Sequence, residues 1–117
     1  TEDQVAMTVL STVVSRNVSD RRIILDAGSK ILSTDKPAWI DGNGFVLGNP
    51  EARISALSEH HATIFWPDKV QLPVIGEQLN IVPNHACNVI NLVDEVYVRE
   101  VDGTFRTWKV VARGRNN

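Results

Sequence analysis

Short runs rich in Val, Ile and Thr, each followed by Gly, Pro or Asp, are the feature that most constrains the fold of this chain. Branched side chains fit a pleated sheet, whereas Gly, Pro and Asp favour turns. The runs predict strands over residues 8–18, 21–26, 54–58, 62–66, 78–82, 95–101 and 104–112, and a dense turn signal at 41–44 precedes a short apolar run at 45–47. Many short strands separated by turns predict a mainly β fold, built as a small barrel or a sandwich.

Helical signals are weak, because no long stretch repeats its apolar residues at the spacing of a helix. We expect at most one or two short helical turns, one of them over residues 88–93. Asp102 and Gly103, between the last two predicted strands, are a strong hairpin signal. The core must therefore be formed by strands.

The size and charge of the chain limit its class of protein. Its 117 residues fit a single domain over residues 1–117. A net charge of −2 argues against a protein that binds nucleic acid by neutralising phosphates. No apolar run approaches the roughly 20 residues needed to cross a bilayer, so we expect no membrane partner. Cys87 is the only cysteine, which excludes an internal disulfide and leads us to expect a cytoplasmic protein.

His85 and Cys87, separated by one residue, form the sharpest local motif. On an extended segment, residues two apart point to the same face, with Cα atoms roughly 6–7 Å apart. An imidazole nitrogen and a thiolate sulfur at that separation can share one cation, and this donor pair suits zinc. Two ligands leave positions open for water or substrate, as in a Lewis-acid site. The alternative is a buried free cysteine beside an ordinary histidine.

A second polar cluster is Glu59, His60 and His61. His60 is a candidate for acid–base chemistry or for contacting a substrate, whereas His61 fits a turn with solvated polar residues. Lys30 lies in a polar, turn-rich stretch, so we expect it to be solvated or ion-paired rather than to carry a Schiff base.

The aromatic side chains fit a role as core or interface anchors better than a platform that stacks bases, given the acidic balance of charge. They are Trp39, Trp66, Tyr97 and Trp108. No glycine-rich loop with the spacing of a phosphate cradle is present in the sequence.

Three segments carry a resemblance to a known family: residues 21–37 (RRIILDAGSKILSTDKP), 56–62 (ALSEHHA) and 72–98. Together they resemble the C-terminal domain of the D-serine dehydratase and D-threonine aldolase group. That group belongs to the alanine-racemase-like, fold type III pyridoxal-phosphate enzymes. The resemblance covers roughly residues 10–112, and its most specific part runs from Gly76 to Cys87.

The resemblance implies an enzyme of two domains. An N-terminal α/β barrel carries pyridoxal phosphate on a lysine, and a C-terminal β domain covers the barrel mouth and supplies metal ligands. The family's metal-binding His and Cys match His85 and Cys87. The family also implies homodimers in which the barrel and the β domain of different chains meet. A chain of 117 residues that starts at Thr1 cannot hold a barrel of about 250 residues, so we expect the β domain of a larger enzyme, inactive alone.

The activity implied is that of a lyase, an aldolase or a dehydratase, acting on β-hydroxy D-amino acids such as D-threonine or D-serine. Zinc or another divalent metal on His85 and Cys87 would bind the substrate hydroxyl. Two alternatives stay open. One is a β module that binds a partner or small ligand without catalysis, and the other is the metal-free C-terminal domain of an amino acid racemase.

Overall fold

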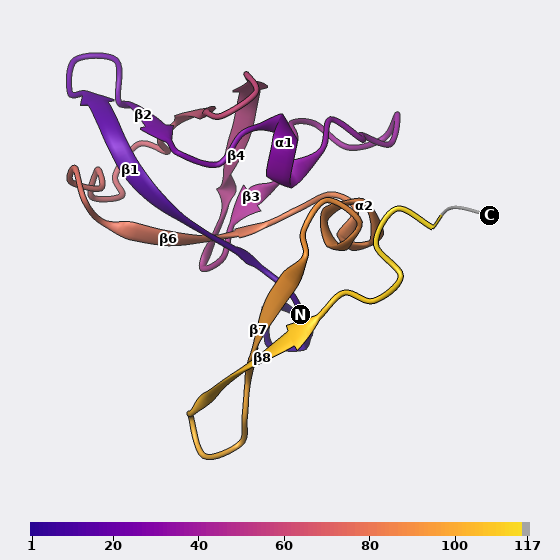
Figure 1. Ribbon diagram of the computed structural model, residues 1–117. Coiled ribbons are helices and arrows are strands. Elements are labelled where there is room, and N and C mark those ends of the chain that lie inside the picture. The colour runs from indigo at the N-terminus through magenta and orange to yellow at the C-terminus, as the bar shows by residue number, and fades with distance from the viewer. Residues whose placement is uncertain (116–117) are drawn as a thin grey trace.

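Six strands close into a barrel, and two further strands form a hairpin outside it (Figure 1). The computed structural model describes residues 1–115. In their order around the barrel, the strands are β1 (Val9–Asn17), β2 (Arg22–Leu25), β5 (Ala62–Phe65), β4 (Asn49–Leu57), β3 (Phe45–Val46) and β6 (Gln78–Val82). All neighbouring pairs are antiparallel. The prediction of a mainly β fold is confirmed, and the architecture is the barrel.

The core lies inside the barrel and follows the two-residue period of its strands. In β2, Ile23 and Leu25 are fully buried while their neighbours are only partly buried. Ile54, Ile64 and Ile81 repeat this pattern in β4, β5 and β6. Because β1 pairs with both β2 and β6, the barrel leaves no open sheet edge among its six strands.

Helices are short, as expected, but their positions differ from the prediction. The helical turn predicted over 88–93 is α2 (Ala86–Ile90), which begins two residues earlier. Two further short elements, η1 (Glu2–Gln4) and α1 (Ser29–Leu32), were not predicted, because neither has the length to show a helical period. Within residues 1–115, no helix is long and apolar enough to cross a membrane.

The strand order brings three segments distant in sequence to one end of the barrel. Leu25 of β2 pairs with Ala62 of β5, which also pairs with Leu57 of β4. Phe45 of β3 pairs with Val82 of β6. The connections over 26–44, 58–61 and 83–94 therefore leave the barrel at the same end.

The hairpin of β7 (Glu95–Arg99) and β8 (Phe105–Lys109) projects away from the barrel (Figure 1). It forms around the predicted turn, with Val98 paired to Arg106. Every residue of β8 is exposed, and Tyr97 of β7 is 80% exposed. An isolated two-stranded hairpin is marginally stable in water, so this one lacks the packing that a hairpin needs.

The four aromatic side chains divide between core and surface. Trp66 is buried at 5% exposure and confirms the prediction of a core anchor. Trp39, Tyr97 and Trp108 are exposed, so a core role for them is wrong. Their role as interface anchors stays a prediction.

Candidate functional site

The segments that carry the family resemblance pack against one another at this end of the barrel. A Cβ on Gly28 would lie 2.4 Å from the backbone C and O of Glu59 and the N of His60. The backbone N–H of Ser29 donates to Ser58 O at 2.8 Å, and that of Lys30 donates to Glu59 O at 3.1 Å. The start of α1 is therefore fixed on the turn between β4 and β5, and glycine is required there by close backbone approach.

Asp26, two residues before that glycine, joins the end of β2 to β1. Its Oδ1 accepts hydrogen bonds from Ser11 Oγ at 2.7 Å and from the Thr12 backbone N–H at 2.8 Å. The Thr12 bond is the main cause that lowers the pKa of Asp26 below its ordinary value, and the Ser11 hydroxyl acts in the same direction. Asp26 thus has a structural role at the end of β2.

The polar residues of the β4–β5 turn are solvated. His61 is exposed in the turn, as predicted, and Ser58 N–H donates to its carbonyl at 2.9 Å. Lys30 Nζ lies 3.3 Å from Glu59 Oε2 with both side chains mostly exposed, which confirms the predicted ion pair. His60 is exposed at the same end of the barrel, and its contact with a substrate stays a prediction.

The segment that carries His85 and Cys87 is not extended over its whole length, so the spacing argument used for the two residues is wrong here. β6 ends at Val82, before Pro83, and His85 is the N-cap of α2. Cys87 lies in the first turn of α2, whereas His85 has extended backbone angles, so the pair does not follow the alternation of a strand. Cys87 is exposed, which also contradicts the alternative of a buried cysteine.

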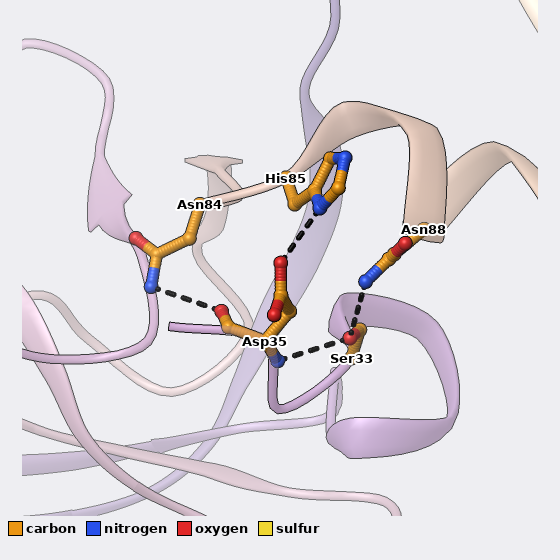
Figure 2. A network of polar contacts seen from close by, with 5 residues as sticks. All are labelled: Ser33, Asp35, Asn84, His85 and Asn88. Carbon is orange, nitrogen blue, oxygen red and sulfur yellow. Dashed lines mark hydrogen bonds and ion pairs between the residues drawn. The ribbon is translucent and has the colours of Figure 1, made fainter. Parts of the chain in front are cut away.

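His85 is held by a residue from a distant loop. Its Nδ1 lies 2.6 Å from Asp35 Oδ2, and the other ring nitrogen points away from the carboxylate (Figure 2). Both side chains are about half exposed, at 45% and 49%. A carboxylate has only acceptors, so the Nδ1 that faces it donates, and in the neutral ring the second nitrogen keeps its lone pair. A lone pair on that nitrogen is the group that binds a metal.

Neighbouring side chains hold the loop of Asp35 against α2. Asn84 Nδ2 donates to the backbone oxygens of Asp35 at 3.3 Å and Gly42 at 3.0 Å. Asn88 Nδ2 lies 3.4 Å from Ser33 Oγ, which accepts from the Asp35 backbone N–H at 3.1 Å (Figure 2). Sequence reasoning missed Asp35, Asn84 and Asn88. The signal that could have found Asp35 and Asn84 is that they lie in two separate segments, 21–37 and 72–98, that both carry the family resemblance.

Two pockets flank this network. One, of about 370 Å³, lies between α1 and α2 and is lined in part by Ser33 and Asn88. The other, of about 500 Å³, is lined in part by Asn84 and the exposed Trp39. In the described part of the chain, no group of three or more His, Cys, Asp or Glu side chains is gathered for a metal ion. The predicted metal ligands remain the pair His85 and Cys87.

The fold and the site define a small β-barrel domain with a carboxylate-held histidine and an exposed thiol at one end. The chain belongs to the putative serine dehydratase domain family, whose sequence model matches residues 6–99. The predicted relationship to the C-terminal domain of the D-serine dehydratase and D-threonine aldolase group is confirmed.

Three comparisons place the chain among its relatives. An uncharacterised protein of Mycobacterium tuberculosis is 51% identical over 116 residues, which are 97% of this chain and 87% of that protein. The structure of D-threonine aldolase from Filomicrobium marinum is similar with a TM-score of 0.77 and 32% identity, over 96% of this chain and 29% of the aldolase. The structure of an alanine-racemase-like protein from Idiomarina loihiensis is similar with a TM-score of 0.83 and 28% identity, over 92% of this chain and 32% of that protein. The chain thus spans about a third of these two solved proteins.

Proposed function

We propose that this chain is the C-terminal metal-binding domain of a pyridoxal-phosphate-dependent lyase for β-hydroxy D-amino acids such as D-threonine or D-serine. The observation that carries the proposal is the His85 ring, which keeps one nitrogen away from Asp35 at the end of the barrel where the family segments meet. The family and the similarity to a D-threonine aldolase support the reaction class.

The donor set fits a divalent metal such as zinc. His85 offers an imidazole nitrogen, and Cys87 offers an exposed thiol in the first turn of the adjoining helix. When bound, the metal would supply a Lewis acid for the substrate hydroxyl. The role of His85 and Cys87 is to hold that metal, and the open positions left by two protein ligands admit the substrate.

Pyridoxal phosphate does not fit the residues of this chain. A Schiff-base lysine must be desolvated, but all four lysines, at positions 30, 36, 69 and 109, are exposed, and Lys30 is paired with Glu59. We assign the coenzyme to the N-terminal α/β barrel that the family implies, so this chain alone has no lyase activity. The barrel also decides between aldol cleavage and dehydration, because the groups that move the substrate protons lie there.

The β7–β8 hairpin is the proposed contact with the barrel or with a second subunit. Tyr97 and Phe105 are 80% and 68% exposed, and Trp108 is 55% exposed. Exposed aromatic side chains on a hairpin without other packing match the anchors of protein interfaces. Such a contact would complete the homodimer that the family implies.

The test uses the enzyme that carries both the barrel and this domain. His85→Ala and Cys87→Ala should each lower lyase activity by orders of magnitude while the pyridoxal absorbance is kept. His61→Ala, on an exposed turn at the same end of the barrel, is the matched control and should keep activity. Unchanged turnover of the first two variants would refute the metal role.

A second candidate is a β module that acts as a separate chain. The mycobacterial relative favours it: 116 aligned residues are 87% of that protein, which leaves no room for a barrel of about 250 residues. The coding sequence upstream of Thr1 distinguishes the two. A barrel with a candidate pyridoxal lysine supports the lyase, and an unrelated domain supports the module.

The other alternative is the metal-free C-terminal domain of an amino acid racemase. It predicts that the purified full-length enzyme retains no zinc.

A further inference from the structure

We propose that Asp35 is a positioning residue for metal binding, which fixes the tautomer and orientation of His85. The inference rests on the proposed function, since it assumes that His85 is a metal ligand. It adds a residue from a different loop, 50 positions away in the sequence, whose carboxylate touches His85 and need not touch the metal.

The contact between the two side chains sets the proton on His85. At 2.6 Å between Nδ1 and Oδ2, this is a short, charge-assisted hydrogen bond. Because the carboxylate only accepts, the neutral ring has its proton on Nδ1 and its lone pair on Nε2. Metal-binding histidines commonly donate their second N–H to a carboxylate in this way, which orients the ring and raises its basicity.

The position of Asp35 is fixed from two sides. On one side, its own backbone oxygen accepts from Asn84 Nδ2 at 3.3 Å, and the same amide also binds Gly42 O at 3.0 Å. Asn84 directly precedes His85, so the residue that binds the loop and the residue that carries the imidazole are neighbours in the chain. A shift of the loop that carries Asp35 would therefore also shift the carboxylate that His85 contacts.

On the other side, Ser33 sets the direction of the loop. Its φ of 64° and ψ of 164° form a conformation that non-glycine residues rarely adopt. Ser33 Oγ accepts the Asp35 backbone N–H at 3.1 Å and lies 3.4 Å from Asn88 Nδ2 of α2. Strained backbone that its surroundings hold in place is found preferentially at functional sites. Here it turns the chain so that Asp35 faces His85 (Figure 2).

The test has two independent readouts on this chain. The first is the tautomer of His85 in the metal-free protein, read from long-range ¹H–¹⁵N correlations of the imidazole. The wild type should carry its proton on Nδ1, and Asp35→Ala should lose that preference. Asp35→Asn keeps an oxygen acceptor and should restore the preference in part. A neutral wild-type ring whose single proton lies on Nε2 would overturn the proposal.

The second readout is the affinity for Co²⁺, followed by the sulfur-to-cobalt absorption that Cys87 would give. Asp35→Ala should weaken binding by about 10–100-fold, with a smaller loss for Asp35→Asn. Asp41→Ala removes an exposed carboxylate from the same loop and is the control for net charge, so it should bind as the wild type does. Equal affinity of wild type and Asp35→Ala would overturn the proposal.

The two proposals fail separately. If the wild type binds no Co²⁺ but shows the Nδ1 tautomer only when Asp35 is present, the metal function fails and the positioning of the ring stands. If Co²⁺ binds through His85 and Cys87 without any effect of Asp35 on affinity or tautomer, the metal function stands and this inference fails. Should Asp35→Ala not fold, Asp35→Asn decides, since it conserves size and one acceptor.

Discussion

Gly28 touches the peptide between Glu59 and His60 so closely that a Cβ at residue 28 would lie 2.4 Å from three backbone atoms. The contact joins the start of α1 to the β4–β5 turn. Residues 21–37 and 56–62, two of the segments that resemble the family, therefore pack directly against each other. The residues of these motifs serve backbone packing as well as any chemical role.

Gly28→Ala is expected to lower the free energy of unfolding by about 3 kcal/mol, because backbone atoms cannot yield to the added methyl group. The φ of −112° at this residue excludes left-handed strain as the cause. Gly48→Ala is the control: nothing lies within 4 Å of its Cβ, and its φ of +87° should cost about 1 kcal/mol. Chemical denaturation of both variants gives the comparison, and equal losses would contradict the packing argument.

Asp26→Asn should flatten the acid limb of the stability profile. The pKa of Asp26 is lowered in the folded chain, mainly by the Thr12 N–H, so the ionised side chain stabilises the fold. That contribution is fully present above the unfolded pKa and is lost as pH falls through the folded pKa, below about pH 4. The measurement is the free energy of unfolding from pH 7 to pH 2. A variant with the same slope as the wild type would show that Asp26 contributes nothing to it.

Zinc should bind this chain weakly when no barrel or substrate is present. His85 and Cys87 provide two protein ligands, whereas stable structural sites use four. Isothermal titration calorimetry should give an affinity weaker than micromolar. Tighter binding would mean that further residues coordinate the metal, and His60, at the same end of the barrel, is the first to replace.

The hairpin should cause self-association when nothing covers it. Tyr97 and Phe105 are apolar, exposed and on one face of β7–β8, since Tyr97 pairs with Thr107 and Phe105 lies two residues away. Sedimentation velocity over a concentration series should show growing oligomers for the wild type and fewer for the double variant Tyr97→Lys, Phe105→Lys. Val18→Lys, an exposed apolar position at the opposite end of the barrel, is the control. A wild type that stays monomeric at high concentration would refute the prediction.

The strands were predictable because their signal is local. A run of β-branched and apolar residues such as 23–25 is visible in a few consecutive positions, and the turn at Asp102 and Gly103 is a dipeptide signal. β4 shows the limit of this approach. It begins at Asn49, before Pro50, whereas the prediction began at residue 54, because Pro50 reads as a break in the sequence.

Sequence reasoning proposed residue types for the site but not their arrangement. His85 and Cys87 were predicted as metal ligands from spacing and resemblance, and that role stays a prediction. The helix that starts at Ala86 shows that the spacing argument, which assumed a strand, does not apply. Asp35 had no local signal at all, since its polar stretch reads as an ordinary turn. A pattern in a few consecutive residues does not show which two loops of a barrel will lie next to each other.

The amino-acid sequence by itself determined the mainly β class, the places of most strands and the family, since each depends on neighbouring residues or on matching segments. Only the tertiary structure decided that Asp35 meets His85, because barrel closure sets which strand ends become neighbours. The hydrogen bond between these two residues is a consequence of that closure and of the backbone turn at Ser33, which together bring residues 50 positions apart within 2.6 Å.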